Sequence, residues 1–328
     1  MARTRYASDP GLIARMGATM FLIGLVFTGF FIALYFVLFD YGKSHNGGVG
    51  AGDGLVVIVL LIAAAVAFGG YYWSDKIALN TARARLVTPQ QAPQLHGIID
   101  RICALANMPK PRVAISPVSM PNAFATGRSS KVAVVCVTEG LLQRLDDKEL
   151  EGVLAHEMSH VAHKDVAVMT IASFLGIMAA LLVRFAFYSE LFGGGGRGRG
   201  GGRGNNQNAF PIILIVMLVG IVVYAISFLL IRLLSRYREL SADRSGALLT
   251  GQPSALASAL VKVTGDIARI PTRDLRQAEP LNAFYFTPAL SGRTGQRSLS
   301  NIFSTHPSLE KRLAQLDKIS KQLGSSAG

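Results

Sequence analysis

His156-Glu157-Met158-Ser159-His160 is the stretch of this sequence that decides both its fold and its chemistry. Positions i and i+4 lie on one face of an α-helix, so the imidazoles of His156 and His160 can point at one metal ion. Glu157 can then reach a water molecule on that ion, which is the arrangement of zinc hydrolases. Two histidines on one helix also occur as ordinary surface residues, so the motif needs a third ligand to support it.

A pair of acidic residues follows the last apolar run of the chain. Glu239 and Asp243 lie four residues apart on a predicted helix and therefore share one face. Glu239 could complete a set of two histidines and one glutamate around zinc, and Asp243 could accept a hydrogen bond from the second ring nitrogen of a ligand histidine. The alternative is a solvated helix face on which these acids pair with Arg236 and Arg244.

The segment Thr305-His306-Pro307-Ser308 precedes a predicted C-terminal helix over 308–322. His306, or Arg312 on that helix, could donate a hydrogen bond to the oxyanion that forms when water attacks a carbonyl group. The competing explanation is a plain helix N-cap by Thr305 or Ser308.

The composition indicates a membrane protein. Of 328 residues, 50% are hydrophobic and 16% are charged, where soluble domains carry about 25% charged residues. The rest of the chain is long enough for one water-facing domain. Four uncharged apolar runs are each close to the ~20 residues that span a bilayer: 16–39, 55–73, 166–183 and 210–231.

The charges and cysteines exclude several other classes of protein. Cys103 and Cys136 lack CxxC spacing, so neither a disulfide framework nor a four-cysteine zinc site can be built, and we expect buried free thiols. The net charge of +13 includes many residues that flank apolar runs. No base-reading or stacking element accompanies this charge, so we expect no nucleic-acid partner.

The distribution of basic residues predicts the orientation in the membrane. Arg3, Arg5 and Arg15 precede the first apolar run, and Lys76 follows the second. The positive-inside rule then places the N-terminus and the catalytic residues in the cytoplasm of a multi-pass protein of the cell (inner or plasma) membrane. Three arginines in the Gly-Arg-rich connection 193–204 conflict with the rule, but the basic flanks outweigh them. Alternatively, the last two apolar runs pack on the water-facing domain without crossing.

The expected fold is α+β, a multi-span helical membrane protein with a mostly helical water-facing domain and a small β-sheet. Runs 113–116 and 131–138, with the segment 122–128 as a connection between them, predict the sheet. Asp146 and Glu149 have capping-box spacing and open a helix that reaches about residue 164. The predicted parts are a first membrane hairpin (1–75), the first half of the domain (76–165), a second hairpin (166–232) and the second half of the domain (233–328).

Five segments, in this order, resemble the HtpX-type membrane zinc metalloproteases, which are related to the CAAX prenyl endopeptidases. The resemblance extends over nearly the whole chain, although the long Gly-Arg-rich connection departs from it. The segments are Pro121-Asn-Ala-Phe-Ala-Thr-Gly127, Val137-Thr-Glu-Gly-Leu141, His156-Glu-Met-Ser-His160, Arg236-Tyr-Arg-Glu-Leu-Ser-Ala-Asp243 and Thr305-His-Pro-Ser308.

The resemblance implies a zincin-like, cytoplasm-facing endopeptidase of membrane-protein quality control, often linked to stress. It implies one Zn²⁺ per chain on His156, His160 and Glu239, with Glu157 as the general base. It also implies that Asn122, Ala123, Phe124 and Ala125 lie at the active-site cleft, where a substrate strand could pair with a sheet edge. The expected partners are protein or peptide substrates, especially membrane proteins, and the lipid bilayer.

Two other classes of function remain open on the sequence alone. One is a zinc-binding membrane scaffold or regulator whose motif is proteolytically inactive. The other is a transporter with a soluble appendage, which the lack of charged residues within the apolar runs disfavours, because transport pathways usually carry ionisable groups inside the membrane. The oligomeric state and the natural substrates do not follow from the sequence.

Overall fold

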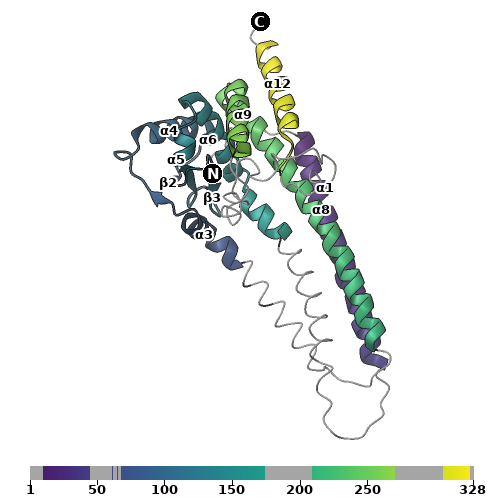
Figure 1. Ribbon diagram of the computed structural model, residues 1–328. Helices are drawn as coiled ribbons and strands as arrows, with labels where there is room; N and C mark the ends of the chain where they lie inside the picture. Colours follow the sequence, from purple (N-terminus) through teal and green to yellow (C-terminus); the bar gives the residue numbers. More distant parts are fainter. Residues whose placement is uncertain are drawn as a thin grey trace. The chain divides into compact units, whose positions relative to one another are not determined.

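The computed structural model describes residues 10–44, 68–173, 209–269 and 306–325, together with residues 61 and 65. The chain forms two compact units, one of residues 1–16, 70–169 and 232–328 and one of residues 17–69 and 170–231. The helices are α1 (Pro10–Ser44), α3 (Ser74–Thr81), α4 (Pro93–Ala106), α5 (Glu139–Leu142), α6 (Asp147–Ala162), α8 (Ala209–Thr250), α9 (Pro253–Arg269) and α12 (Leu309–Ser325) (Figure 1).

A four-stranded mixed sheet forms the β part of the first unit. Its strands are β1 (Arg85–Leu86), β2 (Arg112–Ser116), β3 (Ala123–Thr126) and β4 (Val134–Thr138), in the order β1-β2-β4-β3. β2 runs parallel to β4, whereas β1 and β3 pair antiparallel with their neighbours. The small sheet predicted from the sequence is therefore confirmed. The segment predicted as a connection contains β3, so that prediction was wrong, and β3 is an edge strand of the sheet.

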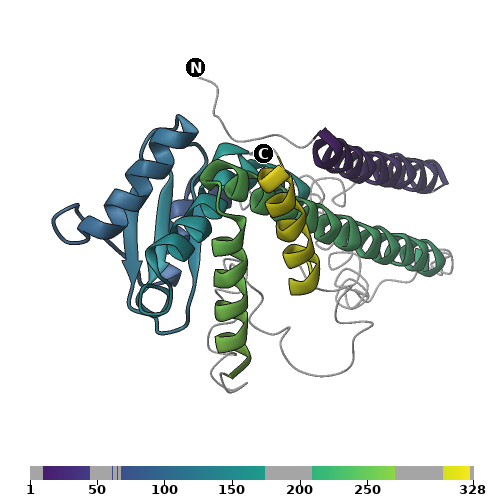
Figure 2. The ribbon, with the colours of Figure 1, turned by 90° about the horizontal axis from the view of Figure 1, so that it is seen from above.

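Both faces of this sheet are covered, which explains why β4 is buried throughout. Alternate side chains of a strand point to opposite faces. Val135 and Val137 join the large core that α4, α6 and α9 complete, while Val134 and Cys136 pack with Ala78 and other residues of a smaller cluster under α3. Figure 2 shows α4 and the strands from above. The helix α6 packs against one face of this sheet.

The helix α6 begins where the capping-box spacing predicts. The Asp146 carboxylate accepts hydrogen bonds from the backbone N–H groups of Lys148 and Glu149, and the Glu149 side chain accepts one from the Asp146 N–H. Such a box satisfies backbone donors that the first helical turn leaves unpaired. The box fixes the residue at which α6 begins. This helps to set which side chains of the helix, including the two histidines, face the interior.

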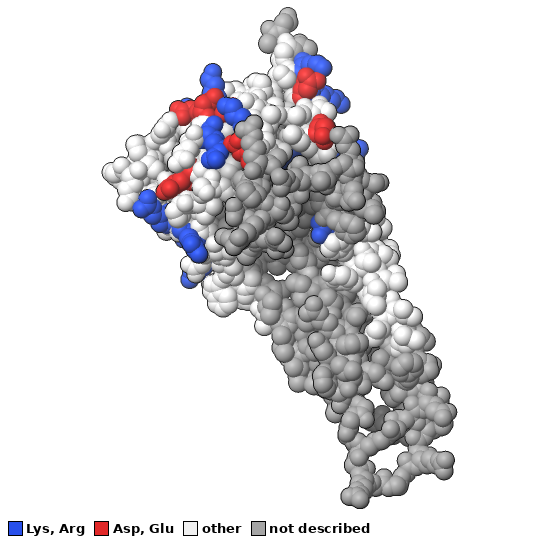
Figure 3. All heavy atoms as spheres, viewed as in Figure 1, with Lys and Arg blue, Asp and Glu red and all other residues white. Residues whose placement is uncertain are grey.

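The helices α1 and α8 are long and apolar enough to cross a membrane. The candidate spans are Pro10–Phe30 and Met217–Thr250, judged by length and composition. Residues 217–231 include no charged side chain, and Figure 3 shows white surface along this part of α8. Most of the predicted spans 55–73 and 166–183, and the whole connection 193–204, lie outside the described residues.

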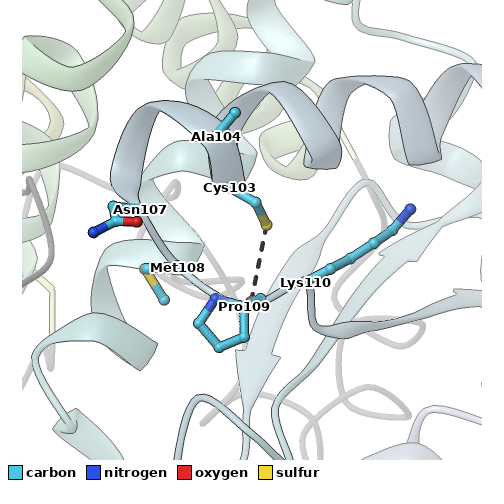
Figure 4. Close-up of a pocket in the computed structure, with 6 residues that line it drawn as sticks. All are labelled: Cys103, Ala104, Asn107, Met108, Pro109 and Lys110. Carbon is cyan, nitrogen blue, oxygen red and sulfur yellow. Dashed lines mark hydrogen bonds between the residues drawn. The ribbon is translucent and has the colours of Figure 1, made fainter. Parts of the chain in front are cut away.

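The two cysteines are buried free thiols, as the sequence predicts. Burial raises the pKa of Cys103 to about 11 and that of Cys136 to about 12. Cys103 adjoins a hollow of about 450 Å³ at the end of α4, which Figure 4 shows in close-up. A thiol with so high a pKa is a poor nucleophile at neutral pH, so the protein offers no reactive cysteine at this hollow.

Candidate active site

The two histidines of the motif lie side by side on α6 and face the interior. His156 is completely buried and His160 is nearly so, and their ring centroids are 5.0 Å apart. The helical spacing expected from the sequence therefore brings the two imidazoles together. A carboxylate then has to come from another element to complete a metal site.

The C-terminal part of α8 supplies that carboxylate. His156 Nε2 lies 3.6 Å from Glu239 Oε2, and His160 Nε2 lies 3.5 Å from Glu239 Oε1. The potential ligand atoms of the three residues all lie within 4.8 Å of one another. Among the described residues, no other group of three or more histidine, cysteine, aspartate or glutamate side chains has this geometry.

The chemistry of this cluster fits a divalent metal ion. Glu239 Oε2 is buried without a hydrogen bond within the described chain, even though histidine nitrogens lie 3.1 and 3.6 Å from it. Leaving a buried carboxylate oxygen unsatisfied is costly. Two imidazoles and one carboxylate form a common ligand set of catalytic zinc, and a cation among them would satisfy that oxygen.

Each of the two histidines contacts, through its Nδ1, a carboxylate that is itself bound to an arginine. His156 Nδ1 lies 2.9 Å from Asp243 Oδ1, and Arg312 donates to both Asp243 oxygens at 2.6 and 2.7 Å. Asp243 therefore lies where it can accept a hydrogen bond from His156. These contacts hold the first imidazole with its Nδ1 toward Asp243, which leaves its Nε2 on the side of Glu239.

The second histidine has a matching support that the sequence analysis missed. His160 Nδ1 lies 2.5 Å from Asp165 Oδ2, and Arg238 lies 3.0 Å from the same oxygen. Burial would raise the pKa of Asp165, but Arg238 and His160 outweigh it and lower the pKa to about 2. Lys164, with φ of 58°, makes the turn that brings Asp165 back toward His160. No pattern of the sequence signals this return.

The close approach of α8 to α6 depends on a glycine. A Cβ atom placed on Gly246 would lie 2.8 Å from the backbone nitrogen of His156 and 3.1 Å from its Cα. Backbone atoms inside a helix cannot move aside independently, so a side chain here would push the helices apart. The hydrogen atom of Gly246 therefore helps to set the distance between Glu239 and the two histidines.

We expect Gly246→Ala to lower the free energy of unfolding by about 1–3 kcal/mol, the usual cost of overpacking, and to weaken metal binding. The matched control is Gly265→Ala in α9, where an added Cβ would meet nothing within 4 Å. Metal content after dialysis and thermal unfolding in detergent would be measured for both variants. Wild-type metal retention and stability in Gly246→Ala would show that the helix approach does not depend on this glycine.

Glu157 lies beside the cluster and faces the edge strand. Its side chain is buried, and its Oε2 accepts a hydrogen bond of 3.2 Å from the backbone N–H of Ala125 in β3. Burial raises the pKa of this carboxyl group above its ordinary value. A carboxylate with a raised pKa is a stronger base, which suits a residue that accepts a proton during a reaction.

The structure brings His306 into the cluster and places Arg312 behind it. His306 Nδ1 lies 3.1 Å from Glu239 Oε2. Arg312 is 1% exposed, and both its Nε and its Nη2 bind Asp243. The sequence predicts either residue as an oxyanion donor. In the structure His306 adjoins Glu239, whereas Arg312 binds Asp243.

The four residues predicted to line the cleft lie in or next to β3. Ala123 and Ala125 face the core on the α6 side of the sheet, whereas the Phe124 side chain packs into the cluster under α3. The backbone N–H and carbonyl of Asn122 bond to Thr138 of β4. Of these four residues, Ala125 makes a direct hydrogen bond to a predicted catalytic side chain, and it does so through its backbone.

A cluster of two histidines and a glutamate, with a second glutamate beside it, is an arrangement typical of metallopeptidases. The model of peptidase family M48 matches residues 89–320. The chain belongs to this family, and it is a metalloendopeptidase with helices able to cross a membrane.

Relatives of known sequence match over almost the full length. "Protease HtpX homolog 1" of Streptomyces coelicolor is 56% identical over 98% of this chain and 97% of the relative. "Protease HtpX homolog" of Moorella thermoacetica is 47% identical over 98% of each chain. Among solved structures, S. mikatae Ste24p is similar with a TM-score of 0.48 and 18% identity, covering 93% of this chain and 67% of that one.

Proposed function

We propose that the protein is a zinc-dependent endopeptidase that cleaves misfolded or damaged membrane proteins on the cytoplasmic side of the cell membrane. The observation that carries the proposal is the set of His156, His160 and Glu239, whose ligand atoms lie within 4.8 Å of one another beside the buried Glu157. In this proposal the three residues hold one Zn²⁺ per chain. When bound, zinc polarises a carbonyl oxygen and lowers the pKa of water, so that the water can lose a proton and attack near neutral pH.

Glu157 is the general base and then the general acid. Its carboxylate takes a proton from the attacking water and later gives the proton to the leaving amine. The Ala125 N–H holds one carboxylate oxygen at 3.2 Å and so limits how the side chain can rotate. Because burial raises its pKa, the carboxyl group can both accept and release a proton under mild conditions.

His306 and Arg312 have separate roles in this mechanism. His306 lies within 3.1 Å of Glu239, close enough to the cluster to donate a hydrogen bond to an oxyanion that forms there. Arg312 uses its Nε and Nη2 on Asp243, so we assign it an orienting role through Asp243 to His156 instead of the oxyanion role predicted from the sequence. A salt-bridged Asp243 accepts the imidazole hydrogen bond without taking up its proton.

The edge strand β3 is the surface on which we place the substrate. It pairs with β4 on one side, and the N–H of Ala125 points away from β4 toward Glu157. An extended peptide could add to this edge through main-chain hydrogen bonds, which bind many different sequences because they involve no side chains. Such binding suits an enzyme that cleaves unfolded chains.

The assignment to membrane-protein substrates is supported by the resemblance described above and by the position of Glu239 on α8. Glu239 follows the apolar stretch ending at Ile231 on the same continuous helix. Glu239 thus lies eight residues after this stretch in the sequence, which suits an enzyme that acts on membrane proteins. The basic flanks of the first apolar run support the cytoplasmic side.

The experiment that tests the proposal is metal removal from the full chain in detergent, with an unfolded model protein as substrate. We expect cleavage to fall below detection after chelation and to return when about one equivalent of Zn²⁺ is added. Magnesium is the control, because it prefers six oxygen ligands and should not restore cleavage. Cleavage that survives complete removal of metal would contradict the proposal.

A further inference from the structure

A second hollow lies where α3 begins, on the part of the first unit that follows the apolar run 55–73. Its volume is about 280 Å³. Figure 3 shows Lys and Arg side chains along the lower left edge of the described chain, toward α3 in Figure 1. The lining residues used below are Tyr72, Trp73, Lys76, Arg128 and Lys131, together with the pair of Asp75 and Arg112.

The hollow carries an excess of positive charge. Four basic side chains line it against one carboxylate, and that carboxylate is neutralised because Arg112 Nη2 lies 2.6 Å from Asp75 Oδ2. Lys76 and Lys131 are exposed, and neither has an ion pair with a described carboxylate. Two ammonium groups therefore face the hollow and can bind an anion from outside the chain.

A third cation is held in a fixed position at the wall of the hollow. The Arg128 guanidinium lies 4.2 Å from the centroid of the Tyr72 ring and donates a hydrogen bond of 3.1 Å to the Tyr72 carbonyl oxygen. The Tyr71 hydroxyl donates to the Arg128 carbonyl oxygen at 3.4 Å. An anion that binds there needs to order only the two lysines, because Arg128 is already in place.

The aromatic residues beside this hollow are of the kinds that gather at the level of lipid headgroups. Tyr72 and Trp73 end the predicted membrane span and are 44% and 52% exposed, and Ile77 one turn later is 48% exposed. Tyrosine and tryptophan gather at membrane interfaces, where one part of the ring is apolar and the other is wet. Exposed apolar side chains next to free lysines suit a ligand with a fatty chain and a charged head.

We propose that this hollow binds the phosphate of an anionic phospholipid from the adjacent membrane leaflet. In this arrangement Lys76 and Lys131 contact the phosphate oxygens, and Arg128 contributes a fixed charge. Trp73 lies against the part of the lipid next to its headgroup. Basic pockets at the membrane surface bind anionic headgroups in this way. The proposal depends on the apolar run 55–73 being a membrane segment and is independent of the catalytic mechanism.

The chain contains one tryptophan, Trp73, so its fluorescence reports directly on the hollow. The full chain would be reconstituted into phosphatidylcholine vesicles that also contain brominated phosphatidylglycerol or, separately, brominated phosphatidylcholine. Bromine quenches tryptophan on contact, so the two lipids can be ranked by how strongly each quenches Trp73. We expect brominated phosphatidylglycerol to be preferred in the wild-type protein.

The test variant is the double substitution Lys76→Gln with Lys131→Gln. Each cation near an anionic lipid surface is worth about 1 kcal/mol, so the preference for phosphatidylglycerol should fall about fivefold for each lysine removed. The control is Lys148→Gln with Lys318→Gln, which removes the same charge from exposed positions outside the hollow. This control should keep the wild-type preference.

Three results would overturn the proposal. Equal quenching by the two brominated lipids in the wild-type protein would show that no anionic lipid is selected. Equal losses in the test and control variants would assign the preference to the general charge of the protein. A shift of Trp73 emission with inorganic phosphate or an acidic peptide in nonionic detergent, without any lipid preference in vesicles, would assign the hollow to a soluble ligand.

Discussion

Replacing Glu157 by glutamine is expected to reduce cleavage of an unfolded protein by about 10³-fold or more while zinc stays bound. General bases contribute about 10²–10⁴-fold to the rate of reactions of this kind. Glutamine keeps the size of the side chain and one oxygen that can accept the hydrogen bond from the Ala125 N–H. It has no basic carboxylate, so it cannot take a proton from the attacking water.

The measurement is the cleavage rate alongside the zinc content of the same purified sample. Glu157 is not part of the cluster of potential ligands, so its replacement should leave the metal content at about one ion per chain. Glu310→Gln on α12, an exposed position outside the cluster, is the matched control and should cleave at the wild-type rate. A Glu157→Gln variant that cleaves as fast as the wild type would show that another group is the base.

The parts of the site that could be predicted from the sequence are those carried by one helix at a time. His156 and His160 share a face because of helical spacing, and Glu239 and Asp243 share a face for the same reason. The structure then brings Glu239 to both histidines and Asp243 to His156. Local periodicity was sufficient because a helix converts spacing in the sequence into direction in space.

The parts that could not be predicted depend on contacts between elements or on a turn. Asp165 reaches His160 because the backbone at Lys164 adopts a positive φ, which is uncommon outside glycine and has no composition signal here. Gly246 looks like any helical glycine until the neighbouring helix is placed against it. The sequence left Arg312 as a candidate oxyanion donor. Its partner Asp243 lies 69 residues away along the chain, so the sequence does not reveal that the two side chains meet.

The small sheet shows the same division between local and long-range information. The apolar run that forms β4 was recognisable because it is buried on both faces. The strand β3, Ala123–Thr126, is four residues long and contains two alanines, so its sequence resembles a connection. It becomes a strand because Phe124 packs under α3 and because β4 offers it hydrogen bonds.

Replacing Glu239 by glutamine is expected to produce the opposite pattern to Glu157→Gln, since both zinc and activity should be lost. The amide is similar in size to the carboxylate, so the helices keep their packing, but the negative charge that faces two imidazoles disappears. Substitution of residues that only support a metal ligand costs about 10–100-fold in metal affinity. Removing a ligand itself should therefore cost more than about 100-fold.

The decisive measurement is the zinc affinity of Glu239→Gln from competition with a chromogenic chelator, with Glu157→Gln as the paired control. The two variants make the same chemical change at neighbouring buried positions, so a general effect of losing a buried carboxylate would appear in both. A loss of zinc affinity of more than about 100-fold in Glu239→Gln alone would identify Glu239 as a ligand, because a residue that only supports a ligand costs about 10–100-fold. Equal zinc affinity in both variants would remove Glu239 from the ligand set and leave it as a charged neighbour of His306, whose Nδ1 lies 3.1 Å from Glu239 Oε2.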